Sequence, residues 1–114
     1  MEAAARGAAA EGGTVLGILP GTDRGAANVF VTVAVATGMG EMRNALIVRT
    51  ADAVIAVGGE FGTLSEIALA LKAEKPVVGL GTWVLAKADG PVADRIARVG
   101  TPDEAVEAAL RDLR

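Results

Sequence analysis

Residues 53–66 read AVIAVGGEFGTLSE, and this stretch decides the fold because a strand, a glycine turn and a helix start follow one another in it. The apolar run over residues 54–57 predicts a buried strand, which the glycine pair 58–59 ends. Gly62 then opens a helix expected over residues 63–73. The unpaired N–H groups and positive dipole end of a helix start favour a bound phosphate. A tight turn without a ligand is the alternative, and glycine spacing alone does not decide between the two.

The composition predicts one small α/β domain over residues 1–114. Hydrophobic residues make up 52% of the sequence and aromatic residues only 3%, so the core must consist of Val, Ile, Leu and Ala, which suits a parallel sheet covered by Ala-rich helices. The net charge of −3 argues against a basic face for nucleic acid. No apolar run has the length of a membrane span, so we expect a soluble cytoplasmic protein that binds neither nucleic acid nor membranes.

The residue types that are missing from the sequence limit the catalytic mechanisms and metal sites that the chain can have. The sequence contains no His, Cys or Tyr. Ser-His-Asp and Cys-His nucleophile systems are therefore excluded, as are metal sites built on His or Cys and any disulfide framework. Catalysis would have to use carboxylates, Arg, Lys, hydroxyl groups and backbone dipoles. We expect no metal and no resident cofactor.

Strands and helices alternate along the sequence. Helices are expected at residues 1–10, 41–50, 63–73 and 102–113, and strands at residues 14–19, 30–36, 53–57, 76–80 and 96–99. The last helix has the clearest start signal, because Thr101 and Glu104 have capping-box spacing and Pro102 occupies the first helical position. The alternation predicts βα units and a doubly wound, mainly parallel sheet flanked by helices.

Two motifs carry a resemblance to a known family. Residues 37–80 read TGMGEMRNALIVRTADAVIAVGGEFGTLSEIALALKAEKPVVGL and resemble the LOG-like (lysine-decarboxylase-like, SLOG) Rossmann superfamily, which includes cytokinin riboside monophosphate phosphoribohydrolases. The family signature PGGxGTxxE corresponds to VGGEFGTLSE at residues 57–66, with Val57 in place of Pro. The Arg-Lys pair that precedes the signature in the family corresponds here to Arg43 and Asn44.

These departures make the chain most similar to a bacterial subgroup of small nucleotide-binding proteins, and the molybdenum cofactor carrier proteins are further similar relatives. The resemblance extends from Met1 to about Trp83 and implies a Rossmann-like fold.

A doubly wound sheet normally begins with a strand, whereas this sequence begins inside an Ala-rich helix. The relatives carry a first strand, a helix, a second strand and a Gly-rich turn before the matching segment. We therefore expect a chain truncated at its N-terminus, with one sheet edge bare.

The resemblance implies binding of a nucleoside 5′-monophosphate and, for an enzyme, cleavage of its N-glycosidic bond to release base and ribose 5-phosphate. Arg43 would offset charge on the phosphate or the leaving base. Glu66 would hold the ribose or the attacking water and stabilise positive charge on the sugar. The phosphate- and nucleotide-binding residues would be Gly38, Gly40, Asn44, Gly58, Gly59, Glu60, Phe61, Gly62 and Thr63.

The rival function is a non-catalytic one: a nucleotide sensor, or a carrier for a cofactor of the molybdenum cofactor type. Asn44 in place of the family's Lys favours it slightly. In either case the expected partner is a small nucleotide or phosphate ligand. The resemblance also implies a homodimer or larger homo-oligomer.

The two proposed catalytic residues also have purely structural interpretations. Thr63 and Glu66 stand at capping-box spacing, in which the Glu66 side chain would only accept the backbone N–H of Thr63. Spacing alone favours this cap, and the resemblance reverses the preference. Arg43 has an alternative interpretation as an exposed helix charge.

Other residues also have alternatives. Gly38 and Gly40 are either turn glycines or a second anion site. Residues 60–61 form either a loop tip or a ligand lid. Asn28 either lines the site or bends its loop. For Trp83, a packing or subunit-contact role is favoured over a role as a platform on which a base stacks.

Overall fold

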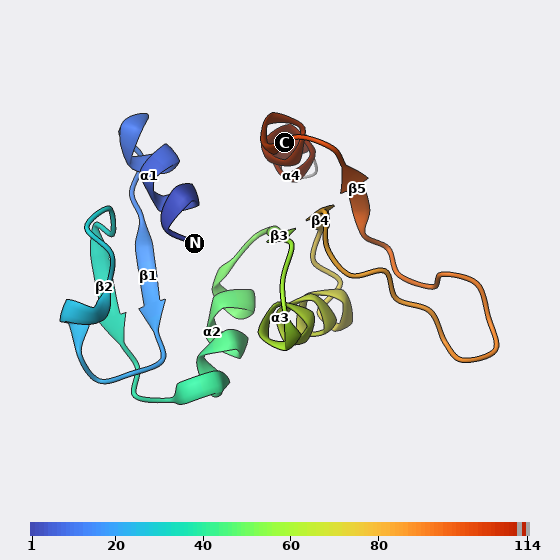
Figure 1. The fold of residues 1–114 in the computed structure, drawn as a ribbon, viewed down its shortest axis with the longest axis horizontal. Coiled ribbons are helices and arrows are strands. Elements are labelled where there is room, and N and C mark those ends of the chain that lie inside the picture. Colours follow the sequence, from blue (N-terminus) through green and yellow to red (C-terminus); the bar gives the residue numbers. More distant parts are fainter. Residues whose placement is uncertain (112, 114) are drawn as a thin grey trace. The chain divides into compact units, whose positions relative to one another are not determined.

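The computed structural model divides the chain into two compact units, Met1–Leu46 and Ile47–Arg114, and describes residues 1–111 and 113 (Figure 1). Within the described residues every strand pair is parallel, and helical segments separate successive strands except β4 and β5, which an irregular loop connects. The order of helices and strands expected from the sequence is therefore confirmed. No helix in the described residues combines the length and the apolar character needed to cross a membrane.

The first unit contains one helix and a two-stranded parallel sheet. Its elements are α1 (Glu2–Ala10), β1 (Leu16–Leu19), the short 3₁₀ helices η1 (Arg24–Ala26) and η2 (Gly40–Met42), and β2 (Val33–Ala36). The strands pair in register from Leu16 opposite Val33 to Leu19 opposite Ala36. The alanines of α1 explain its formation, since Ala has the highest helix propensity.

Both strands of this unit are shorter than expected, because two polar side chains accept backbone N–H groups next to the strand ends. The hydroxyl of Thr32 accepts the N–H of Val15 at 2.9 Å, which replaces a regular ladder bond. The side chain of Asn28 accepts the N–H of Phe30 at 3.0 Å and its carbonyl accepts the N–H of Val31, which forms a turn where strand was expected. Asn28 therefore does bend its loop.

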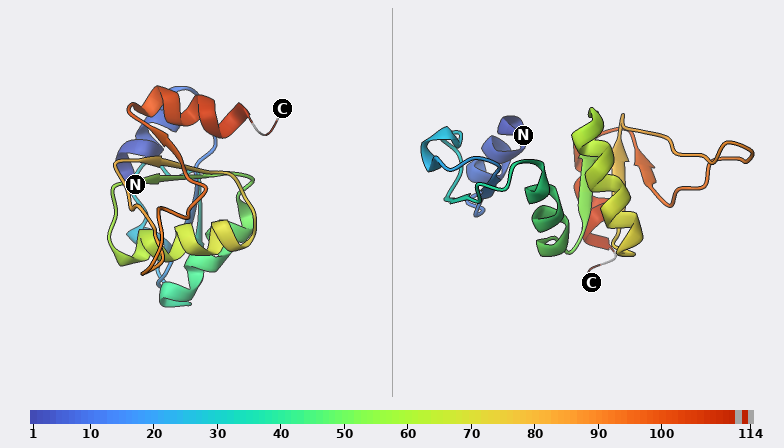
Figure 2. Two further views of the ribbon diagram at one scale, coloured as in Figure 1. Left: turned by 90° about the vertical axis from the view of Figure 1, so that its right-hand side faces the viewer. Right: turned by 90° about the horizontal axis from the view of Figure 1, so that it is seen from below.

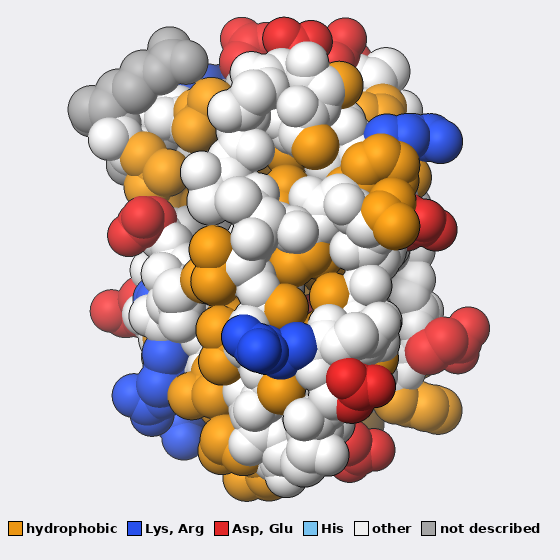
Figure 3. All heavy atoms as spheres, turned by 90° about the vertical axis from the view of Figure 1, so that its left-hand side faces the viewer, with side chains coloured by type: hydrophobic (Ala, Val, Ile, Leu, Met, Phe, Trp, Pro, Cys, Tyr) orange, Lys and Arg blue, Asp and Glu red, His pale blue; other side chains and the backbone are white. Residues whose placement is uncertain are grey.

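The small sheet leaves much apolar surface in contact with solvent. Leu16, Val33 and Val35 have exposed fractions of 49%, 49% and 43%. Figure 3, which views the protein from the side of β2, shows hydrophobic side chains between scattered acidic and basic groups. Two strands bury too little surface to form a core of their own, which accounts for this exposure.

The second unit is a three-stranded parallel sheet between helices. Helix α2 (Arg43–Thr50), which begins in the first unit, leads into β3 (Val54–Val57). The elements α3 (Phe61–Lys72), β4 (Val77–Leu80), β5 (Ala97–Val99) and α4 (Pro102–Arg111) follow, and the strand order is β3-β4-β5. The registers run from Val54 opposite Val77 and from Val78 opposite Ala97. All six elements were expected, and β5 is the edge strand predicted at residues 96–99.

Helices α3 and α4 cover opposite faces of this sheet. Val77 and Val78 are neighbours on β4 and therefore point to opposite faces. One core cluster lies on the α3 face and consists of Val48, Ala56, Ile67, Ala70, Val77 and Ile96. The other lies on the α4 face and consists of Val78, Ala105 and Ala109. Figures 1 and 2 show the strands between the two helices.

Helix α3 begins two residues earlier than expected. It starts at Phe61, its N-cap is Glu60 in extended conformation, and the N–H of Leu64 bonds the Glu60 carbonyl at 3.1 Å. Thr63 is thus already inside the first turn, and the proposed capping box between Thr63 and Glu66 is wrong. The physical reason is that the glycine pair turns the chain within two residues.

The capping box at the start of α4 is present. The N–H of Glu104 bonds the Thr101 hydroxyl at 3.2 Å. The Glu104 carboxylate accepts the N–H of Gly100 at 3.0 Å, one residue before the position that the motif usually uses. Helix α4 ends at Arg111, before the predicted end at residue 113, and residue 112 lies outside the described residues.

Candidate functional site

The turn between β3 and α3 depends on two glycines with positive φ. Gly58 has φ +53° and Gly59 has φ +110°, a region that residues with a side chain rarely adopt. A Cβ on Gly59 would also overlap the side chain of Thr63. The N–H of Gly58 bonds the Leu80 carbonyl at 3.0 Å, so the turn begins from the last sheet hydrogen bond. The sequence therefore folds here into a tight strand-to-helix connection.

The N–H groups after this turn are available to a ligand. Within the part of the chain that the structure describes, no acceptor meets the backbone N–H groups of residues 59–61. The first turn of α3 contains no acidic residue, and the side chain of Glu60 makes no capping bond. Unpaired donors at the positive end of a 12-residue helix are suited to an anion.

Two aromatic rings lie beside the turn. Phe61, the first residue of α3, is 75% exposed. Its ring centroid is 5.7 Å from that of Trp83, with the rings tilted by 33°. Trp83 also packs against the core cluster on the α3 face, and its indole Nε1 donates to the Glu60 carbonyl at 3.1 Å. These contacts support the interpretation of Trp83 as a packing residue.

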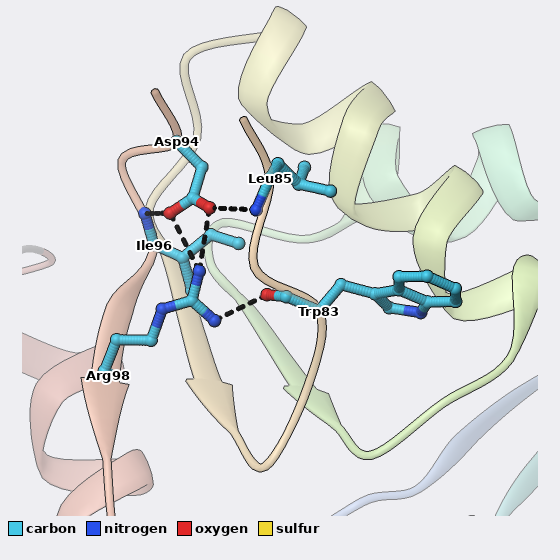
Figure 4. A network of polar contacts seen from close by, with 5 residues as sticks. All are labelled: Trp83, Leu85, Asp94, Ile96 and Arg98. Atoms are coloured by element: carbon cyan, nitrogen blue, oxygen red, sulfur yellow. Dashed lines mark hydrogen bonds and ion pairs between the residues drawn. The ribbon is translucent and has the colours of Figure 1, made fainter. Parts of the chain in front are cut away.

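A buried carboxylate organises the loop between β4 and β5, as Figure 4 shows. The side chain of Asp94 is 2% exposed and accepts the N–H groups of Leu85 at 2.7 Å and Ile96 at 3.2 Å. The Nη2 atom of Arg98 donates to both carboxylate oxygens, at 2.9 and 2.8 Å. The Nη1 atom of Arg98 donates to the Trp83 carbonyl at 2.5 Å.

Opposing effects act on the pKa of Asp94. Burial raises it, but the hydrogen bonds from the backbone of Leu85 and Ile96, and the hydrogen bond and charge of Arg98, together lower it below the ordinary value of 3.8. Asp94 is therefore a carboxylate at neutral pH, and its ion pair with Arg98 is intact there.

The remaining predicted residues lie in the first unit and at the start of α2. The N–H groups of Gly38 and Gly40 bond the carbonyls of Gly21 at 2.8 Å and Pro20 at 2.9 Å. Both glycines have positive φ, of +64° and +58°. Because these donors already have acceptors, the geometry favours the interpretation as turn glycines over a second anion site.

Arg43 and Asn44 begin α2 and are not exposed helix residues. Asn44 is only 9% exposed. Arg43 is half-buried, and its Nη1 donates to the Ile18 carbonyl at 3.3 Å. The Nε atom of Arg43 is buried, and within the described residues no acceptor meets it. Glu66 lies half-buried in the second turn of α3. The catalytic roles of Arg43 and Glu66 stay predictions.

Sequence reasoning missed the residues that hold the turn from the β4–β5 loop. Thr82 donates its hydroxyl to the Gly58 carbonyl at 2.6 Å, and Asp94 and Arg98 hold the backbone of Trp83. The loop has no periodic pattern and no motif. Only the four-residue spacing of Asp94 and Arg98 was visible, and outside a helix that spacing predicts no contact.

Comparison with known proteins identifies the family. The sequence model of the SLOG cluster4 family (LDcluster4) matches residues 1–106. The chain belongs to this family. An uncharacterised protein of Archaeoglobus fulgidus is 46% identical over 106 residues, which cover 93% of the chain and 65% of that protein. The chain thus spans slightly less than two thirds of the length of this curated relative.

Two solved structures that are similar to this chain are of proteins whose names state a ligand. The molybdenum cofactor binding protein of the phototrophic bacterium Rippkaea orientalis has 31% sequence identity and a TM-score of 0.82, over 97% of this chain and 69% of its own. The Moco carrier protein of Chlamydomonas reinhardtii has 35% identity and a TM-score of 0.80, over 99% of this chain and 70% of its own. The resemblance to the SLOG superfamily and the Rossmann-like α/β fold are therefore confirmed.

Proposed function

We propose that the chain is a binding protein for a phosphate-bearing heterocyclic cofactor of the molybdenum cofactor type, and that the backbone turn at residues 58–63 holds the anionic group. The observation that carries this proposal is the structural likeness to a molybdenum cofactor binding protein and a Moco carrier protein. These relatives support the cofactor carrier that the sequence left as the alternative.

The geometry of the turn supports the proposal in physical terms. The N–H groups of residues 59–61 supply donors without a side-chain charge, which suits a phosphate that must be bound and released. The exposed ring of Phe61 lies next to these donors and offers an aromatic face for a planar heterocycle. An anion and a ring on one ligand would use both features.

Nucleotide hydrolysis, the main function expected from the resemblance, stays a prediction. It requires Arg43 and Glu66 to act on a nucleoside 5′-monophosphate. The proposed carrier requires neither residue to take part in chemistry. The homodimer expected from the resemblance likewise stays a prediction.

Gly62→Asp tests the anion site with little structural disturbance. A Cβ on Gly62 meets nothing within 4 Å, and its φ is not positive, so a side chain fits there. Asp in the first turn of a helix is favourable for the helix dipole, and so the variant should melt no lower than wild type. The same negative charge should weaken binding of an anionic ligand about tenfold or more.

The assay is equilibrium binding of molybdenum cofactor, released from a purified molybdoenzyme, with AMP as a second probe. Gly62→Asn is the matched control, because it has the shape of Asp without its charge. We expect saturable binding to wild type, near-normal binding to Gly62→Asn and a large loss in Gly62→Asp. Equal affinities in the two variants, or no binding of either probe by wild type, would overturn the proposal. Release of ribose 5-phosphate from AMP would instead favour the hydrolase.

A further inference from the structure

Two consecutive residues of the loop after β4 donate hydrogen bonds to carbonyl groups of the turn at residues 58–63. Thr82 donates its hydroxyl to the Gly58 carbonyl at 2.6 Å. Trp83 donates its indole N–H to the Glu60 carbonyl at 3.1 Å. Gly81 separates both donors from the end of β4, and they lie 24 and 23 residues beyond the carbonyls that they contact. Two separate peptide groups of the turn are thus fixed from outside it.

Holding these carbonyls also fixes the N–H groups that a ligand would meet. In a trans peptide the C=O and the following N–H point in opposite directions. The bond from Thr82 therefore sets the direction of the Gly59 N–H. The bond from Trp83 acts together with the helix bond from the Leu64 N–H to set the direction of the Phe61 N–H. Glycine has the most backbone freedom, so the pair at 58–59 is where such a restraint matters most.

The loop that supplies the donors is itself anchored by an ion pair between the buried Asp94 carboxylate and the partly exposed Arg98. Arg98 on β5 donates to the Trp83 carbonyl, and the Asp94 carboxylate holds Arg98 with two hydrogen bonds (Figure 4). Asp94 also accepts the N–H of Leu85, so the main chain is fixed on both sides of position 84. The backbone of Trp83 is thereby tied to the sheet while its side chain is tied to the turn.

We propose that Thr82 and Trp83 are positioning residues, which aim the N–H groups of the turn at the ligand, and that the Asp94–Arg98 ion pair holds them in place. This inference rests on the proposed function, because it takes the turn to be the ligand site. Neither residue needs to touch the ligand. Their effect is to remove the freedom that the turn would otherwise lose on binding, which raises affinity.

A purely structural role for these residues makes different predictions at position 82. The Cγ2 methyl of Thr82 lies against the backbone of Gly79, where an added Cβ would be only 2.8 Å away, so this methyl contributes to packing. Thr82→Val keeps that shape and loses the hydroxyl donor. Thr82→Ser keeps the donor and loses the methyl. Packing and positioning therefore rank the two variants in opposite order.

The experiment measures binding of molybdenum cofactor and of AMP to the full chain with Thr, Ser or Val at position 82. We expect Thr82→Ser to bind within about twofold of wild type and Thr82→Val about tenfold more weakly. Trp83→Phe, which keeps an aromatic ring but loses the indole N–H, should also bind about tenfold more weakly. Thr14→Val, at an exposed position in the first unit, is the control and should bind like wild type.

Amide NMR provides a readout that does not depend on a ligand. The order parameter of the Gly59 N–H should fall in Thr82→Val and be retained in Thr82→Ser. Equal binding by the Ser and Val variants, with an unchanged Gly59 amide, would overturn the positioning role and leave the proposed function standing. If wild type binds neither probe, the proposed function fails, and the Gly59 amide alone then decides whether Thr82 sets the turn.

Discussion

Lys75→Met should destabilise the protein markedly, because one ammonium group satisfies three carbonyls. The Nζ atom of Lys75 donates to the carbonyls of Val48 at 2.6 Å, Arg49 at 3.0 Å and Ala51 at 2.5 Å. The carbonyls of Val48 and Arg49 belong to the last turn of α2, where helix geometry leaves them without an internal partner. Met fills similar space and cannot donate.

The magnitude follows from which carbonyls water can reach. The bond to Arg49 is exposed, so water replaces it at little cost, whereas the bonds to Val48 and Ala51 are partly buried. Leaving two partly buried carbonyls unsatisfied costs about 1 kcal/mol each. Loss of a positive charge at the end of a helix adds about 0.5 kcal/mol. The free energy of unfolding should therefore fall by about 2–3 kcal/mol, or about 10 °C in melting temperature for a chain of this size.

Urea unfolding followed by the fluorescence of Trp83 measures this change, since Trp83 is the single tryptophan and lies in the same unit as Lys75. Lys72→Met is the control, because Lys72 is exposed at the end of α3 and the same substitution there should cost less than about 0.5 kcal/mol. If both variants lose the same stability, the bonds from Lys75 contribute nothing beyond a surface charge and the estimate is refuted.

Two further predictions concern carboxylates. Because the folded pKa of Asp94 lies below 3.8, its contribution to stability is complete above that pH and is lost as the pH falls through the lowered pKa. Asp94→Asn should flatten this acid limb in thermal melts while Asp89→Asn, in the exposed loop, retains it; coincident curves for wild type and Asp94→Asn would contradict the role of the ion pair. Glu66→Gln should abolish any release of ribose 5-phosphate from AMP with an unchanged melting temperature, and full turnover in this variant would remove Glu66 from the chemistry.

Local sequence signals predicted the elements of the second unit well. The apolar run at residues 54–57, the glycine pair after it and the capping residue Thr101 each act over a few residues, and the structure contains the strand, turn and helix that they predict. The start of α3 was misplaced because Gly62 was expected to open the helix. The turn at Gly58 and Gly59 is so tight that the helix already begins at Phe61.

The long-range hydrogen bonds of the second unit, including those that hold the turn of the candidate site, could not be predicted from such local signals. Lys75 contacts carbonyls 24 to 27 residues away, and Trp83 contacts a carbonyl 23 residues away. These bonds depend on how strands align in the sheet, which periodicity does not encode residue by residue. Asp94 and Arg98 lie in a stretch without a motif, and no sequence signal predicted their ion pair.

The hydrogen bonds that fix the turn have a consequence for the order of events during synthesis. A ribosome releases the chain from its N-terminus, so residues 58–63 emerge well before Asp94 and Arg98. The nascent chain can close the strand-to-helix connection early, but the groups that hold the Trp83 backbone arrive some 30 residues later. A nascent chain that ends before β5 would have the right turn sequence and a loosely held turn. Under the proposed function, the turn would then reach its ligand-binding geometry only when β5 joins the sheet.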